Sequence, residues 1–95
     1  MDDNRELLIE RMADNLPVLR KKLKMTQEDL GDVIGMSRYT VMLIETKKRK
    51  LTWNNFLALM LLFEKNENTK VLVRALDIYT DGLDLYLKGD RKTGV

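Results

Sequence analysis

Apolar residues recur at intervals of three and four along most of this 95-residue chain, which is the spacing of amphipathic helices. The segments with this spacing are 5–12, 16–23, 30–34, 41–44, 53–63 and 71–79. Residues 83–87 instead alternate between apolar and polar positions, as strands do. A strand needs partners to be stable, so we expect helix or irregular structure there. The pattern predicts an all-α protein, a compact bundle of five or six helices.

The N-terminal quarter of the chain is compatible with one helix or with two. A first helix over 5–12 can be followed by a second that begins at Asp14 or Asn15, because both residues are good helix caps. Pro17 is tolerated in the first turn of that second helix. Alternatively, the two segments form a single helix bent at Pro17. The residues that these segments are expected to bury are Leu8, Ile9, Met12, Leu16, Leu19 and Leu23.

The middle of the chain predicts two short helices joined by a tight turn. Thr26 caps the first helix, and Asp29, three residues later, completes a capping-box pattern. Gly35 ends that helix in a left-handed conformation, and Ser37 caps the next one. Gly31 costs about 1 kcal/mol relative to alanine inside a helix, so we expect another helix to pack closely against it. The residues expected to face the core are Leu30, Val33, Ile34, Val41 and Ile44.

The C-terminal half predicts two further helices. Thr52 caps a strongly apolar segment, 53–63, and residues 64–68 form a polar break. Asn68 or Thr69 then opens the next helix. Its inward residues are expected to be Val71, Leu72, Ala75, Leu76 and Tyr79.

The composition excludes several kinds of chemistry. The chain has no histidine and no cysteine, and Ser37 is its only serine, so nucleophile–histidine pairs and thiol chemistry are unavailable. A zinc site would need carboxylates alone, which is unusual, and no glycine-rich phosphate loop is present. We therefore expect no enzyme activity, no catalytic residues, no bound metal and no cofactor.

The same sequence carries no mark of a membrane or secreted protein. No apolar run approaches the roughly 20 residues that span a bilayer. The N-terminus is acidic and lacks the basic and apolar parts of a secretory signal. We expect a cytoplasmic protein with no membrane partner, although the lack of cysteine leaves the redox compartment open.

Positive charge is concentrated in the middle of the chain. Residues 20–50 contain nine cations and four carboxylates, a net charge of +5, whereas the whole chain carries only +2. Basic clusters lie directly before and after the two short helices, at 20–24 and 47–50. Such separation builds a positive face on a nearly neutral protein, as in many nucleic-acid-binding proteins.

Residues in the same region also carry a family resemblance. They are Arg20, Thr26, Gln27, Leu30, Gly31 at a position that is usually alanine, Gly35, Ser37, Arg38, Val41, Ile44, Glu45 and the region of Leu59. This half of the chain resembles the phage-repressor (Cro/Xre-like) helix-turn-helix family, which has a lambda-repressor-like fold. The resemblance implies a DNA-binding domain over 14–66, with an N-terminal helical extension (1–13), a C-terminal helical extension (67–88) and a flexible tail (89–95).

In that family, the helix that corresponds to residues 37–45 enters the major groove of DNA. The resemblance therefore places Arg38, Tyr39 and Leu43 at base edges. Arginine can hold guanine O6 and N7 with two hydrogen bonds, although Arg38 can equally pair with a phosphate. Leu43 stands at a usually polar position, so it either contacts a thymine methyl group or packs on protein. The residues expected at DNA phosphates are Lys24, Gln27, Ser37, Thr40, Lys47, Lys48, Arg49 and Lys50.

Two further family positions, Arg20 and Glu45, imply a partly buried ion pair with a structural role. The chain also departs from the family pattern. Lys47 replaces a glycine after the second short helix, which leaves the geometry of that turn open. Ala58 and Leu61 are apolar where the family's fourth helix shows water a polar side chain, so we expect the C-terminal helix to cover them.

The resemblance implies a transcriptional regulator, a repressor, that binds double-stranded DNA. One recognition helix covers few base pairs, so we expect a homodimer on repeated half-sites. Either Leu7–Met12 or Val71–Leu87 can supply the dimer surface or pack internally. A chain of this size leaves no room for an effector domain, so we expect no small-molecule effector. The alternative is a protein-interaction module, such as an antitoxin or a mobile-element accessory protein, with Met42 and Leu43 as an apolar patch.

Overall fold

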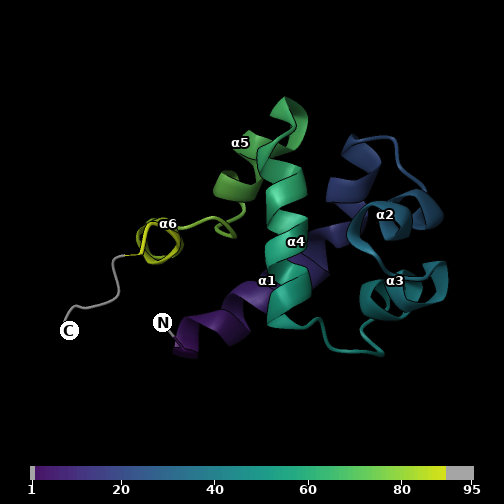
Figure 1. Cartoon of the computed structure of the whole chain (residues 1–95), viewed down its shortest axis with the longest axis horizontal. Helices are drawn as coiled ribbons and strands as arrows, with labels where there is room; N and C mark the ends of the chain where they lie inside the picture. Colours follow the sequence, from purple (N-terminus) through teal and green to yellow (C-terminus); the bar gives the residue numbers. More distant parts are fainter. Residues whose placement is uncertain (1, 90–95) are drawn as a thin grey trace.

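The computed structural model describes residues 2–89 and is entirely helical over that range (Figure 1). This confirms the predicted all-α bundle, and it shows that residues 83–87 are part of a helix. No helix in this range is long and apolar enough to cross a membrane. The helices are α1 (Asp2–Lys22), α2 (Gln27–Ile34), α3 (Arg38–Glu45), α4 (Trp53–Glu64), α5 (Glu67–Ala75) and α6 (Asp81–Leu87).

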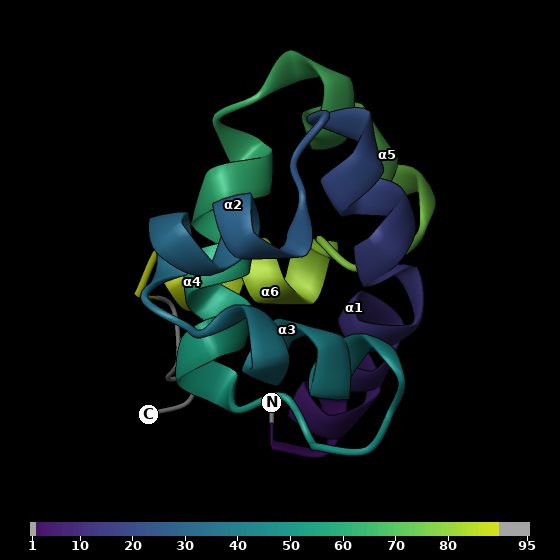
Figure 2. The ribbon, with the colours of Figure 1, turned by 90° about the vertical axis from the view of Figure 1, so that its right-hand side faces the viewer.

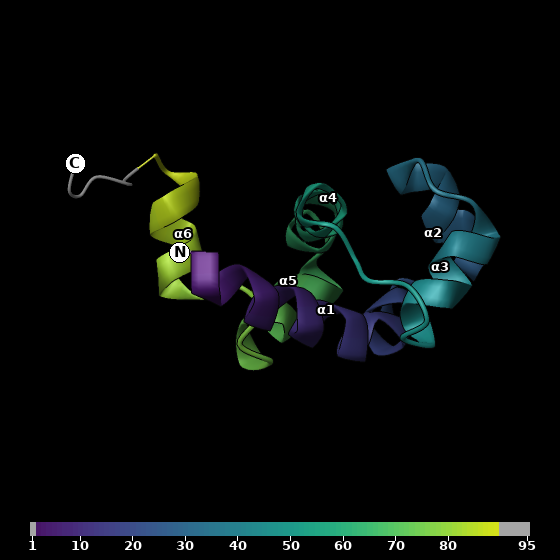
Figure 3. The same ribbon diagram turned by 90° about the horizontal axis from the view of Figure 1, so that it is seen from below.

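The helices are distributed along a molecule that measures 41 × 28 × 20 Å. α1 extends along one side and α4 lies in the middle (Figure 3). The α2–α3 pair occupies one end of the long axis, and α6 occupies the other. The described C-terminal helix is therefore remote from the two short helices.

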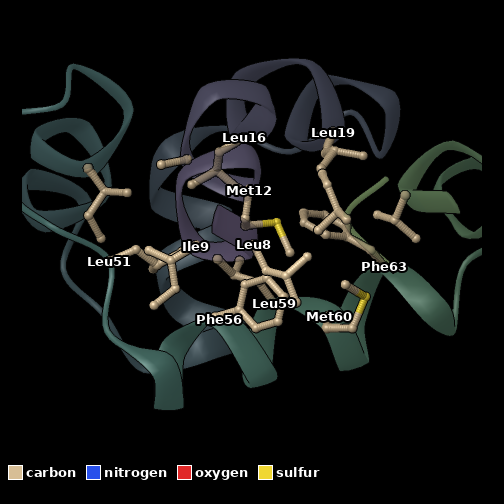
Figure 4. Packing of buried hydrophobic residues seen from close by; sticks show 14 of the residues in the cluster. Leu8, Ile9, Met12, Leu16, Leu19, Leu51, Phe56, Leu59, Met60 and Phe63 are labelled. Atoms are coloured by element: carbon tan, nitrogen blue, oxygen red, sulfur yellow. The ribbon is translucent and has the colours of Figure 1, made fainter. Parts of the chain in front are cut away.

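One apolar core joins α1 to α4 and to the helices on either side (Figure 4). Leu8, Met12 and Leu16 recur every four residues on α1 and are almost inaccessible to water, as are Phe56 and Phe63 of α4. Burial of such side chains contributes roughly 1.5–3 kcal/mol each. α1 therefore owes its position to packing along its length, as the apolar spacing predicted.

α1 is one continuous helix, which agrees with the single-helix alternative and excludes a separate helix capped by Asp14 or Asn15. The Asn15 side chain donates a hydrogen bond to the Arg11 carbonyl, 2.8 Å away, four residues earlier. Pro17 lies inside α1, where it removes one backbone hydrogen bond but does not end the helix. Packing on both sides of the proline outweighs that loss, and α1 crosses the expected domain boundary between residues 13 and 14.

The start and the buried face of α5 also differ from expectation. α5 follows α4 after two residues, with Asn66 at its N-cap rather than Asn68 or Thr69. Thr69 is fully buried, and its hydroxyl donates to the Phe63 carbonyl at 2.8 Å, which satisfies the open end of α4. This contact sets the register, so Val73 is buried in place of Val71. Ala75, on the same side as Val71, is exposed as well.

α6 is attached to the rest of the molecule through a few specific contacts. Leu83 enters the core, and the Tyr86 hydroxyl accepts a hydrogen bond of 2.7 Å from Arg5 at the start of α1. The Arg5 guanidinium lies over the rings of both Trp53 and Tyr86. Tyr79, just before α6, donates to Asp84 at 2.7 Å. Of the expected polar tail at 89–95, all but the first residue lie outside the described range.

α6 does not cover Leu61, contrary to expectation. Leu61 is 62% exposed and borders two shallow apolar hollows, one on each side of α4. Val33 of α2 lines one hollow and is 55% exposed, so its assignment to the core was also wrong. The other hollow is bordered by Tyr79 and Leu87. α2 and α6 flank this face of α4 without closing over it.

Candidate nucleic-acid interface

α2 begins with a complete capping box. The Thr26 hydroxyl accepts from the Asp29 backbone amide at 3.0 Å, and the Asp29 carboxylate accepts from the Thr26 amide at 2.9 Å. Both predicted partners are therefore confirmed, and two otherwise open amides at the helix start are satisfied. The box fixes where α2 begins relative to the end of α1.

The turn between α2 and α3 depends on two glycines. Gly35 has φ of 76° and ψ of 41°, the left-handed conformation predicted for the end of α2. The Met36 amide donates to the Gly31 carbonyl at 2.8 Å. A Cβ atom on Gly31 would stand 2.1 Å from the Met36 carbonyl oxygen. The close neighbour of Gly31 is therefore the turn itself. The expectation that another helix packs against Gly31 was wrong.

α3 is capped by Ser37, as predicted. The Ser37 hydroxyl oxygen accepts from the Thr40 amide at 3.0 Å and donates its own proton to the Thr40 hydroxyl, also at 3.0 Å. Arg49, in the loop after α3, donates to the same Thr40 hydroxyl at 3.3 Å. These contacts connect the start of α3 with the basic loop. Ser37 and Thr40, two of the expected phosphate ligands, are thus also capping residues.

The candidate recognition residues lie on the outer side of the molecule. Arg38 is exposed and Tyr39 is 64% exposed, both in the first turn of α3. Figure 2 shows α2, α3 and the loop after α3 on the side that faces the viewer. Met42 and Leu43 are half-buried, so they present less apolar surface than an exposed patch requires. The face that α3 offers is therefore mainly polar at its N-terminal end.

A buried ion pair holds α3 against α1. Arg20 donates to Glu45 through Nε at 2.7 Å and through a terminal nitrogen at 3.0 Å, which confirms the predicted pair. Their side chains are only 11% and 5% exposed. Arg20 also donates to the Met25 carbonyl at 2.9 Å. The hydrogen bond from Arg20 to Glu45 raises the pKa of the guanidinium above its ordinary value, so Arg20 remains charged.

Gln27 joins this ion pair. Its side-chain amide donates to Glu45 at 3.0 Å, so Glu45 connects α1, α2 and α3. One of the two side-chain N–H donors of Gln27 is therefore used within the protein. Lys24, also expected at phosphate, lies in the short link before α2 with a positive φ of 58°, and it is exposed.

The basic loop that follows α3 is pinned to α1. Lys47 adopts the left-handed conformation, with φ of 65°, at the position where the family has glycine. Its ammonium group pairs with Asp14, and that hydrogen bond raises the pKa of Lys47. Lys50 pairs with Glu6 at 2.5 Å. Lys48 has no ion pair within residues 2–89, so the four expected phosphate ligands of this loop differ in their availability.

Comparisons with protein-family models, with curated proteins and with solved structures found no match to this chain. The family resemblance therefore stays a prediction from its residues. The geometry agrees with it in three local respects: two caps, a left-handed glycine and a buried ion pair. Within residues 2–89, no three acidic side chains gather closely enough to hold a metal ion.

Sequence reasoning did not foresee the partners of Lys47 and Lys50. Asp14 was one of two candidate helix caps, and Glu6 was given no role. A periodic pattern was nevertheless present, because Glu6, Glu10 and Asp14 are four residues apart and share one face of a continuous α1. This pattern could be interpreted only once the structure showed that the loop lies against that face.

Proposed function

We propose that this protein binds double-stranded DNA in a sequence-specific manner through a helix-turn-helix formed by α2 and α3, and that it acts as a transcriptional repressor in the cytoplasm. The observation that supports this most is the exposed first turn of α3. Arg38 and Tyr39 are directed outward there, between basic segments at 20–24 and 47–50. The resemblance to phage repressors supports the same proposal, as does the lack of histidine and cysteine for nucleophilic or thiol catalysis.

In this mechanism α3 lies in the major groove and its first turn reads base edges. Arg38 donates two hydrogen bonds to guanine, and Tyr39 offers a hydroxyl to a base or phosphate and a ring to a thymine methyl group. Leu43 is half-buried, so it adds at most an apolar contact at the edge of the groove. The capped helix start positions these side chains, since Ser37 and Thr40 fix the first turn.

Phosphate contacts supply the affinity that does not depend on sequence. Lys48 and Lys24 are exposed and lie on either side of the α2–α3 pair in the chain. Counterions that these cations displace from DNA favour binding at low salt. Gln27 has a second side-chain N–H to donate to a phosphate, and Ser37 lies at a helix start, but neither residue adds positive charge. The lysines and arginines therefore carry most of the salt dependence.

We also propose that the protein binds as a homodimer, because one helix covers only a few base pairs. Of the two segments considered for the dimer surface, the N-terminal one is mostly committed to the core, since Leu8, Ile9 and Met12 are buried. The C-terminal segment leaves Val71 and Leu87 exposed. Sedimentation of the protein alone and on a selected duplex tests the stoichiometry, with two chains per site expected.

Selection of bound sequences from a random duplex pool is the test of the proposed function. We expect a consensus with two related half-sites, one helical turn or a multiple apart. The matched control replaces Arg38 and Tyr39 by alanine, which removes exposed side chains and leaves the core intact. A pool that shows no enrichment, together with no complex on any duplex at low salt, contradicts the proposal.

The second candidate function is a protein-interaction module. The specific observation in its favour is the exposed apolar face of α4, where Leu61 and Val33 border the same hollow. Met42 and Leu43, the patch considered from the sequence, are half-buried and support it less. Failure of DNA selection, combined with intact folding, favours this candidate.

A further inference from the structure

Three acids on α1 form a row beside the basic loop. We call Glu6, Glu10 and Asp14 the acidic ridge. Glu6 and Asp14 pair with Lys50 and Lys47 respectively, and Glu10 adds a favourable coulombic interaction with Lys47. The three acids therefore face the loop as a group.

The ridge and the loop enclose a shallow hollow of about 310 Å³. Glu6 and Glu10 line one side, and Lys47–Lys50 line the other. Leu51, at the end of the loop, is buried in the core and holds the loop against α1. The carboxylates are not enclosed: the side chains of Asp14 and Glu6 are 57% and 66% exposed. A polyanion that approaches the loop therefore meets both the cations and the carboxylates that pair with them.

The ridge changes how many loop cations are free for a phosphate group. Lys47 and Lys50 already have carboxylate partners, and Arg49 donates one hydrogen bond to Thr40. Among the four cations of the loop, only Lys48 has neither a carboxylate partner nor a side-chain hydrogen bond within residues 2–89. To contact Lys47 or Lys50, a phosphate has to replace a carboxylate and then remain next to it.

We propose that the acidic ridge competes with DNA phosphates for the basic loop and thereby weakens binding to any duplex. This inference rests on the proposed DNA-binding function. The carboxylates meet the backbone and not the bases, so the weakening is the same on selected and random sequences. Replacement of the ridge acids by neutral amides therefore strengthens binding without a change in sequence preference.

The test compares the wild-type chain with the double variant Glu6→Gln/Asp14→Asn on selected and random duplexes over a salt series. Two freed lysines steepen the slope of log affinity against log salt by up to about 1.8 units, since each phosphate contact contributes about 0.9. At low salt, affinity rises by up to about 25-fold, because each exposed ion pair carries at most about fivefold. The gain is equal on both duplexes.

Two further variants separate competition from other causes. Glu10→Gln removes a ridge charge without breaking either ion pair, and it is expected to raise affinity by a smaller factor with an unchanged slope. Glu67→Gln/Asp81→Asn removes the same charge as the double variant from exposed first turns of α5 and α6, away from α3 (Figure 1). This control is expected to leave both affinity and slope close to those of wild type.

The outcomes are distinct. If wild type binds DNA and the ridge variants bind equally or more weakly, the ridge positions the loop or has no role, and the inference is overturned. An equal gain in the α5–α6 control also overturns it, because net charge then explains the effect. If wild type and the ridge variants all fail to bind any duplex at low salt, the proposed function fails and this inference fails with it.

Discussion

At Gly31 the chain leaves no room for a side chain, although the position lies in the middle of a regular helix. The Met36 carbonyl comes within 2.1 Å of the place where a Cβ atom would stand. That carbonyl belongs to the turn that connects α2 to α3, so it cannot move away without a change in the turn. Gly35 is restricted for a different reason, since its φ of 76° is left-handed while the space around it is open.

Gly31→Ala is expected to lower the free energy of unfolding by about 1–3 kcal/mol, through overpacking against the turn. The matched control is Gly82→Ala in α6, where the nearest atom to a new Cβ is 3.9 Å away. That change is expected to be neutral or stabilising by up to about 1 kcal/mol. Urea unfolding of both variants measures the difference. Equal stability of the two contradicts the close approach.

Arg38→Ala is expected to weaken binding to the selected site by about 1–3 kcal/mol, and binding to random duplex much less, because a bidentate contact to guanine is lost. Fluorescence anisotropy on both duplexes measures the two affinities. Lys70→Ala, an exposed cation on α5, is the control for the loss of one charge. Equal weakening on both duplexes would assign Arg38 to a phosphate.

Tyr79 is expected to titrate above the ordinary range of a tyrosine side chain. The pKa of Tyr79 is raised to about 12. The hydrogen bond to Asp84 is the larger cause, and burial of the side chain is the second. A group with a raised folded-state pKa stabilises the fold fully below its unfolded pKa, near 10, and loses that contribution as the pH rises towards 12. Ultraviolet absorbance during alkaline titration measures this step. Tyr79→Phe should remove the step near pH 12, whereas a wild-type titration without that step would contradict the hydrogen bond.

Local features of individual residues were the easiest to predict from sequence. The caps at Thr26 and Ser37 and the left-handed Gly35 depend on neighbours within four residues, so the sequence contains all of their determinants. Val33 was wrongly assigned to the core. Apolar spacing indicates which residues share a helix face, but it does not indicate how much of that face other helices cover. Val71 was misplaced because the register of α5 depends on a contact between Thr69 and α4.

At the scale of helices, Glu45 is the point where three elements meet. It accepts hydrogen bonds from Arg20 on α1 and from Gln27 on α2, while itself ending α3. α3 has only eight residues, too short to be stable alone in water, so its position depends on such contacts and on Val41 and Ile44 in the core. The ion pair thus orients the exposed face of α3.

Glu45→Ala is expected to cost about 3–5 kcal/mol, because it leaves the buried Arg20 guanidinium without a counter-charge. Thermal or urea unfolding measures the loss. The double variant Arg20→Met/Glu45→Leu is expected to recover most of it, since apolar residues of similar size avoid the uncompensated charge. A loss below about 1 kcal/mol for Glu45→Ala would mean that solvent replaces the partner.

Lys48→Ala is expected to lower the salt slope of DNA binding by up to about one unit, because an unpaired loop cation is removed. Lys50→Ala is the matched control in the same loop, and its effect should be smaller because Lys50 is paired with Glu6. Titrations at several salt concentrations measure both slopes. An unchanged slope for Lys48→Ala would remove this residue from the phosphate contacts.

Contacts between elements were predictable only where a family resemblance supplied them. The Arg20–Glu45 pair spans 25 residues and was anticipated from family positions, not from spacing. The pairs between the loop and α1 had no such source. They depend on α1 continuing from Glu6 through Asp14 without a break, and the sequence left open whether a new helix begins at Asp14 or Asn15.

At the scale of the whole molecule, the candidate interface and the C-terminal part of the described chain lie far apart. The α2–α3 pair lies at one end and α6 at the other, with α1 and α4 between them (Figures 1 and 3). The all-helical class and the apolar core followed from periodicity, because spacing of three and four is a property of the entire chain. The position of α6 could not be predicted from periodicity, because its attachment relies on side chains as far apart in sequence as Arg5 and Tyr86.

The Arg5 guanidinium lies over the rings of Trp53 and Tyr86 near α6, and Trp53 is therefore an intrinsic optical probe of this region. Trp53 is the only tryptophan, and it stacks on Phe56 at 4.8 Å while the Arg5 guanidinium lies 4.8 Å from its ring. Its emission is therefore expected to depend on whether α6 is in place, because Arg5 also contacts Tyr86 of α6. Local opening at this end would change the fluorescence while the far-ultraviolet circular dichroism still reports folded helices, so this opening can be distinguished from global unfolding in one sample.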